Sequence, residues 1–148
     1  MEFRELQQSD LSSYIELLTE LDQEHVLSLE AGKELLNKIK SYPFYKVYLF
    51  INEDGEIIGT CSLLICDNFG HGGAKFAIVE NVVVHAAHKK LGIGKMMMEL
   101  VKTIAAEEGC YKLMLSSNES RTGAHAFYDS LGFIRHGLSF RTELNVND

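Results

Sequence analysis

The sequence holds few of the residues that build disulfide frameworks, zinc centres or linkers. Its 148 residues include one proline and three cysteines. Cys61, Cys66 and Cys110 form no C-x-x-C pair, and an odd number at irregular spacing predicts neither a disulfide framework nor a zinc site. We interpret them as reduced thiols of a cytoplasmic protein. The single proline, Pro43, lies in "KSYPFYK" and marks a turn between a helical and a strand-like stretch, not a domain boundary.

Positive charge and long apolar runs are also scarce. Lysine and arginine number 14 against 21 aspartates and glutamates, a formal net charge of -7. Nucleic-acid binding needs a dense basic surface, so we expect no nucleic-acid partner. No apolar run is long enough to span a bilayer, and the charged start "MEFRELQQSD" is unlike a secretory signal, so we expect no membrane partner either. The length predicts one domain over residues 1–148.

Hydrophobic periodicity predicts an α/β chain with a single mixed sheet. The expected strands are 3–6, 45–52, 56–67, 74–84, 110–117 and 137–144, and the expected helices are 9–22, 28–41, 92–108 and 123–132. Ser9 is the expected cap of the first helix, and Met97, Leu100, Val101 and Ile104 form the expected apolar stripe of the third. The strand–helix–strand unit over 74–117 predicts a right-handed parallel crossover, with helices on both faces of the sheet.

Cations and flexible backbone stand at the turn from a valine-rich strand into a helix, in "VVVHAAHKKLGIGK". A helix start leaves N–H groups unpaired and carries partial positive charge, so it favours phosphate. Gly92 and Gly94 let backbone approach a phosphate closely, and Lys89, Lys90 and Lys95 add charge. The pattern fits neither a Walker loop nor a dinucleotide fingerprint, because Met96 and Met97 stand where those motifs need other residues. A helix start with solvated lysines explains the composition equally well.

Lys89 to Gly94 resembles the acetyl-CoA motif [Q/R]-x-x-G-x-[G/A] of the GNAT N-acetyltransferases, with Lys89 in place of the usual Gln or Arg. "GCYKLMLSSNESRTGAHAFYDSLGF" is similar to the last strand and helix of that family, and its details look closest to small bacterial members such as the aminoalkylphosphonate N-acetyltransferases. The resemblance implies the GNAT fold, an α/β (α+β) architecture with a mostly antiparallel mixed sheet, splayed central strands and helices on both faces. It also implies acetyl-CoA as the acetyl donor.

The resemblance further implies which residues hold acetyl-CoA. In the family the valine-rich strand leaves its neighbour, often at a bulge, and the pantetheine arm pairs with the freed backbone. In the family an Asn commonly stands seven residues before the catalytic tyrosine, where this chain has Arg121, and Asn118 lies earlier. The implied cofactor contacts are Val82, Val83, Val84, Lys89, Lys90, Leu91, Gly92, Ile93, Gly94, Lys95, Asn118 and Arg121. A buried strand would explain the valines, and turn chemistry would explain Asn118 and Arg121.

Two residues match the family's acid and base. Glu80 lies among β-branched residues in "AIVENVVV", where partial burial would raise the pKa of its carboxyl group and improve it as a general base. A solvated strand position or pairing with a lysine would also explain it. Tyr128 matches the acid that protonates the departing thiolate, because a phenol with a pKa near about 10 is protonated at neutral pH. A core tyrosine is the simpler explanation of its packing beside Phe127 and Leu131.

These residues predict an N-acetyltransferase that moves acetyl from acetyl-CoA to a primary amine of a small molecule, by direct attack in a ternary complex. One alternative is acetylation of a protein N-terminus or lysine. An alternative of another class is a non-catalytic acyl-CoA binding module, which would need the glycines of the helix start but neither Glu80 nor Tyr128. We expect no metal, and the family's habit of dimerising suggests a homodimer.

Overall fold

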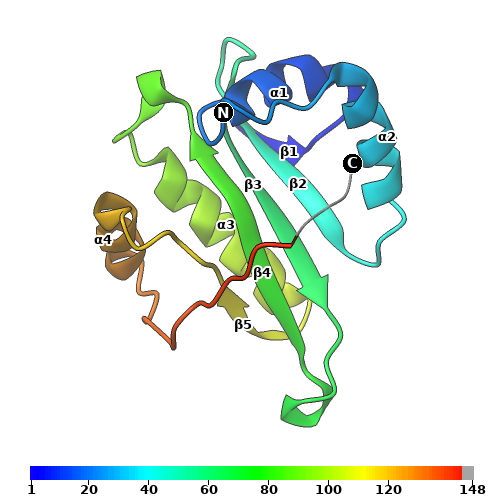
Figure 1. The fold of residues 1–148 in the computed structure, drawn as a ribbon. Helices are drawn as coiled ribbons and strands as arrows, with labels where there is room; N and C mark the ends of the chain where they lie inside the picture. The colour runs from blue at the N-terminus through cyan, green and yellow to red at the C-terminus, as the bar shows by residue number, and fades with distance from the viewer. Residues whose placement is uncertain (145–148) are drawn as a thin grey trace. The chain divides into compact units, whose positions relative to one another are not determined.

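The computed structural model describes residues 1–144, and the chain divides into two compact units, Met1–Leu115 and Ser116–Asp148, each described by itself. Figure 1 shows the elements. The strands are β1 (Glu2–Glu5), β2 (Tyr45–Ile51), β3 (Ile57–Cys66), β4 (Lys75–Val84) and β5 (Cys110–Met114). The helices are α1 (Leu11–Leu18), α2 (Leu29–Ile39), α3 (Ile93–Glu107) and α4 (Thr122–Ser130), with short 3-10 turns η1 (Gln8–Asp10), η2 (His71–Gly73) and η3 (Ala86–His88).

The five strands form one sheet in the order β1-β2-β3-β4-β5, within the N-terminal unit. The first four strands are antiparallel neighbours, and β5 runs parallel to β4 after the chain has passed through α3. A parallel neighbour needs such a crossover, because a tight turn cannot reverse the chain twice. The mixed, mostly antiparallel sheet predicted from the sequence is confirmed.

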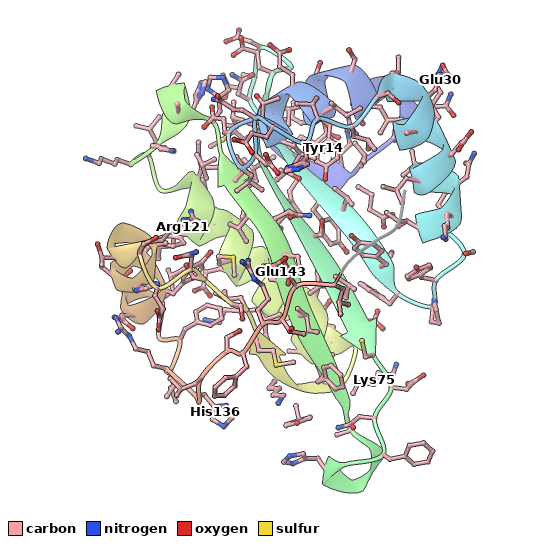
Figure 2. All side chains as sticks on the ribbon, viewed as in Figure 1. Tyr14, Glu30, Lys75, Arg121, His136 and Glu143 are labelled. Carbon is pink, nitrogen blue, oxygen red and sulfur yellow. The ribbon has the colours of Figure 1, made fainter. Side chains whose placement is uncertain are left out.

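Helices cover both faces of this sheet (Figure 1). On one face, α1 and α2 pack on β2, in a cluster that includes Leu11, Tyr14 and Leu49. Tyr14, labelled in Figure 2, is 8% exposed, and its burial raises the pKa of its phenol to about 12. On the other face, Ile93 and Met97 of α3 pack on β2 and β3. Successive side chains of β2 therefore point to opposite faces of the sheet and pack in two separate apolar clusters.

Two details of the helices correct the sequence expectations. Ser28 caps α2 as a helix start should, accepting from the Ala31 N–H at 3.2 Å. Ser9 does not cap α1, because it lies inside η1, and Asp10 precedes the helix. The Asp10 carboxylate instead accepts from Arg4 at 2.7 Å and from the Gln7 N–H at 2.8 Å, which closes the earlier turn. In α3, Leu100 is 38% exposed, and Met98 and Ala105 take its place in the buried stripe.

The closing strand expected over 137–144 is wrong. Those residues adopt no strand, and Leu138 and Phe140 are exposed. Alternating apolar residues give a segment strand propensity, but a strand also needs a hydrogen-bonded neighbour. Within residues 116–144 the structure has no second strand that could supply one. The strand expected over 110–117 is real but ends at Met114.

Candidate active site

The start of α3 has the geometry of an anion site. Gly92 precedes the helix in the left-handed region at φ 80°, and no side chain caps the helix. The Met96 N–H is the first to bond back, to the Gly92 carbonyl at 3.0 Å. The N–H groups of Ile93, Gly94 and Lys95 therefore have no partner within the helix. They point outward from a helix end that carries partial positive charge.

Three cations surround this helix start. Lys89, Lys90 and Lys95 are exposed, and none of them forms an ion pair with another residue in the range 1–144. Leu91 is exposed, whereas Ile93 is 3% exposed and holds the first turn on the sheet. The residues therefore fit a diphosphate, which combines two negative groups with many acceptor oxygens.

Gly59 of β3 fixes where this helix start lies, and sequence reasoning missed it. A Cβ added at Gly59 would lie 2.9 Å from the Met97 Sδ and 3.4 Å from the Ile93 Cγ2. Only a glycine lets α3 approach β3 this closely. The signal in the sequence was a glycine inside the strand-like run "EIIGTCSLLIC", a position that often marks close approach of another element.

The strand that leads to this loop contains a bulge. Ser62 pairs with Glu80, and Thr60 pairs with Val83, so β4 uses one residue more than β3 between these pairs. The extra residue is Asn81, whose φ is 51°. Asparagine tolerates this region better than most residues do. The bulge that the family resemblance implied is therefore present.

Within residues 1–115, the part of β4 beyond the bulge pairs with β3 and with no other strand. Its pairing with β5 ends at Ile78 and Met114. The His85 N–H donates to the Ile58 carbonyl at 2.9 Å, on the β3 side. Because backbone direction alternates along a strand, the N–H and C=O groups of Val82 and Val84 turn away from β3. The second half of β4 thus presents strand backbone that β5 leaves unpaired, as expected for splayed strands.

Glu80 lies at the boundary between the two halves of β4. Its cross-strand partner is Ser62, which in turn pairs with Val47 of the α1/α2 cluster, so Glu80 belongs to that face. The side chain is exposed, and the partial burial expected from its β-branched neighbours is wrong. Val79, the residue before Glu80, is buried. The bulge begins directly after Glu80, so the sheet no longer encloses the carboxylate on both sides.

Next to Glu80, the bulge residue Asn81 borders an open hollow that sequence reasoning did not find. The second half of α1 and the loop after it form the rest of its wall, which consists of Ile15, Leu18, Thr19, Leu21, Asp22, His25, Val26 and Leu27. The Asp22 carboxylate accepts from the Glu24 and His25 N–H groups and bonds the His25 ring at 2.9 Å. These bonds lower the pKa of Asp22, the Glu24 amide most of all. Only the fold brings this loop to β4, so no local motif signals the hollow.

The remaining predicted residues lie in the C-terminal unit. The Asn118 Oδ1 accepts from the Ser120 N–H at 2.9 Å and from its hydroxyl at 2.8 Å, which is the turn chemistry that the sequence also allowed. Arg121, labelled in Figure 2, is exposed at the start of α4. Tyr128 is half-buried, with its ring centroid 5.2 Å from that of Phe127 and 5.7 Å from that of Phe133.

None of the helices within residues 1–144 is both long and apolar enough to cross a membrane. No three His, Cys, Asp or Glu residues of this part of the chain are grouped so that they could hold a metal ion.

An uncapped helix start after a bulged strand that β5 leaves partly unpaired is the arrangement that the resemblance implied for an acetyltransferase of the GNAT type. A sequence model of the acetyltransferase (GNAT) family matches residues 4–133, and the chain belongs to this family. The glucosamine 6-phosphate N-acetyltransferase of Trypanosoma brucei brucei is 35% identical over 148 residues, which cover 97% of this chain and 96% of that relative. The protein is thus an N-acetyltransferase of this family.

Solved structures agree. The crystal structure of a Trypanosoma brucei acetyltransferase superposes with a TM-score of 0.86 at 33% identity, covering 97% of this chain and 99% of that one. Glucosamine-6-phosphate N-acetyltransferase from Arabidopsis thaliana gives a TM-score of 0.88 over 97% of this chain and 99% of that one. At 24% identity, the second match shows the fold alone. The GNAT fold expected from the resemblance is confirmed.

Proposed function

We propose that this protein transfers the acetyl group of acetyl-CoA to the amino group of glucosamine 6-phosphate. The observation that supports the reaction class is the second half of β4, which β5 leaves unpaired and which leads through η3 to the uncapped start of α3. The similarity to the trypanosomal enzyme over nearly the full length of both chains supports the acceptor. It favours a sugar phosphate over the aminoalkylphosphonates that the sequence details suggested, although both are phosphorylated amines.

The donor side of this proposal uses residues of the N-terminal unit. The N–H groups of Ile93 to Lys95 and the lysines at 89, 90 and 95 would hold the diphosphate of acetyl-CoA. The backbone groups of Val82 and Val84 would hold its amide-containing arm, as a neighbouring strand would. Acetyl-CoA supplies an activated acetyl thioester when bound. Holding that group still against an amine supplies much of the rate by proximity.

On the acceptor side, Glu80 would take up a proton as the amine attacks. The carboxylate lies one residue before Asn81, which borders the hollow under the α1 loop. An amine bound in that hollow would come to the same part of β4 as Glu80. The exposure of Glu80 favours proton transfer through a water molecule, as in a general base that is not in direct contact with its substrate.

Tyr128 would return a proton to the thiolate that leaves. This role rests on the family resemblance, and the packing of its ring between Phe127 and Phe133 supports it by fixing the side chain. Contacts of Asn118 and Arg121 with the cofactor, a homodimer and a cytoplasmic location stay predictions. The family match over 4–133 supports a single catalytic domain, because it spans parts of both units.

A panel of amines tests the proposal by the release of CoA. The panel contains glucosamine 6-phosphate, glucosamine, 2-aminoethylphosphonate and a lysine peptide. We expect the highest kcat/KM with glucosamine 6-phosphate, and a loss of at least about tenfold for glucosamine, since one charge-assisted contact to phosphate contributes that much. Saturable CoA binding without release on any of the amines would instead favour the non-catalytic module.

A further inference from the structure

One carboxylate joins two distant parts of the N-terminal unit. Glu20 lies in the turn that directly follows α1, and its Oε1 accepts from the Ala86 N–H at 2.9 Å. Ala86 opens η3, the turn between β4 and the cofactor loop at 89–95. The two residues are 66 positions apart in the chain. The contact therefore ties the end of α1 to the segment that sets the entry into α3.

The other amides of η3 are held locally. The Ala87 N–H donates to the His85 Nδ1 at 3.1 Å, and the His88 N–H donates to the His85 carbonyl at 2.8 Å. With Glu20 on the Ala86 N–H, each residue of η3 has its amide bound. Of these three bonds, only the one from Glu20 comes from outside the loop. It therefore ties η3 to the turn after α1, in addition to the bond that the preceding His85 N–H donates to the Ile58 carbonyl of β3.

The turn that carries Glu20 is itself anchored, and it borders the hollow. The Glu20 N–H donates to the Leu17 carbonyl at 3.1 Å, and Leu17 is 4% exposed. Thr19, Leu21 and Asp22, the neighbours of Glu20 in the chain, line the hollow with Asn81. The same short turn thus lines the hollow proposed for the amine and forms a hydrogen bond to η3, next to the loop proposed for acetyl-CoA.

We propose that Glu20 is a positioning residue that couples the acceptor hollow to the acetyl-CoA loop. Its bond to Ala86 holds η3, so that the amides at the start of α3 are in place before the diphosphate arrives. An amine that fills the hollow restrains the turn after α1, and through Glu20 it restrains the loop as well. Binding of either ligand orders the turn after α1 and η3. The second ligand then loses less conformational entropy on binding, so each ligand favours the binding of the other. The coupling rests on the proposed function.

The first test measures the affinity for CoA alone, by calorimetry. We expect Glu20→Ala to weaken CoA binding about threefold to tenfold, the range for one lost charge-assisted hydrogen bond at an exposed site. Glu20→Gln keeps an acceptor oxygen and should recover most of the affinity. Glu16→Ala makes the same change of charge one turn earlier, at an exposed residue, and should bind CoA like the unmodified protein. A folded Glu20→Ala variant with unchanged CoA affinity would overturn the positioning role.

The second test measures coupling, as the ratio of CoA dissociation constants without and with saturating glucosamine 6-phosphate. We expect a ratio above one for the unmodified protein and near one for Glu20→Ala. In steady state, the KM for acetyl-CoA should rise in Glu20→Ala while kcat changes less than about twofold, a split that general destabilisation would not give. A ratio that survives in Glu20→Ala overturns the coupling and leaves the proposed acceptor intact. CoA binding with no effect and no turnover from glucosamine 6-phosphate overturns both.

Discussion

The two halves of β4 have similar side chains but different neighbours. The half from Lys75 to Val79 has a neighbour on each side, since Phe76 to Val79 pairs with β3 and Lys75 to Ile78 pairs with β5. The half from Glu80 to Val84 contains three valines, yet β5 pairs with none of it. Asn81 stands close to the division, as the extra residue of the bulge. The first half builds the sheet, and the second half offers backbone to a ligand.

The difference teaches that hydrophobicity alone does not say whether a strand is structural or functional. Both halves contain β-branched or aromatic residues, which favour a sheet in either case. What separates the halves is where the neighbour stops and where α3 begins. Gly59 lets α3 pack closely against β3, which neighbours the open half of β4. The β4 backbone that β5 leaves unpaired therefore leads to the anion site at the start of α3. Variants in the open half of β4 and variants outside β4 should therefore affect different properties.

The largest effect is expected at Glu80, in the open half. Glu80→Gln should lower kcat/KM near neutral pH by about a hundredfold, because the amine must then lose its proton unaided. Activity should recover toward higher pH, where more of the amine is already neutral. A pH–rate profile of both proteins checks this. If the profile keeps its shape and position, Glu80 is not the base.

Tyr128→Phe comes next and asks whether the chemistry needs a residue outside the sheet. We expect kcat to fall by about tenfold to a hundredfold, since the thiolate would leave without its acid. CoA affinity, measured by calorimetry, should stay within about twofold, because the ring and its packing are kept. A variant with the full kcat would remove Tyr128 from the mechanism.

Asn81 tests the division itself. Asn81→Val places a β-branched residue at φ 51° and should cost about 1–3 kcal/mol of stability, lowering the melting temperature by roughly 2–10 °C. It should also lower kcat/KM several-fold, since the bulge sets the open half. Asn81→Gly suits the same backbone and serves as the control in both assays. Equal melting temperatures for Val and Gly would mean that the strain is absent.

The smallest effect on activity is expected far from the open half, at the edge strand. The hydrogen bond from Arg4, and then the Gln7 amide, hold the pKa of Asp10 below its usual range. A lowered pKa in the folded state stabilises above the unfolded pKa of about 3.9, and this stability is lost as pH falls through the folded value. Asp10→Asn should therefore lower the free energy of unfolding by about 1 kcal/mol at pH 7, a value that allows for solvent screening at the half-exposed Arg4.

Denaturant unfolding at several pH values checks this prediction. The gap in the free energy of unfolding between the unmodified protein and Asp10→Asn should narrow as the pH drops below about 4. The KM for acetyl-CoA at pH 7 should be the same in both. A gap that widens toward acid would contradict the assigned sign.

Local patterns predicted the elements well where side chains alone decide them. The second helix, the helix that begins near Gly92 and the strand over 74–84 were all predicted from periodicity, and the structure has them as α2, α3 and β4. The closing strand failed because pairing is a property of two segments, not of one. Ser9 failed as a cap because Asp10 engages Arg4 and Gln7, and Arg4 lies in another element.

The candidate site divides in the same way. The glycines and lysines before α3 were readable, since a helix start and its charges are contiguous in the chain. The exposure of Glu80 was not, because it depends on a bulge that follows it. The hollow and the Glu20 contact join the loop after α1 to residues more than fifty positions away, and neither leaves a local signature.

The bulge has one more consequence, for how such a strand can arise. Asn81 and Val82 together stand opposite Cys61, so the added residue is absorbed and the inward and outward order of Glu80, Val82, Val83 and Val84 is that of a regular strand. Removing Asn81 would restore an unbroken ladder without turning any valine to the wrong side of the sheet. A single inserted codon therefore suffices to add this bulge to a sheet strand, and every valine keeps the face of the sheet that it had.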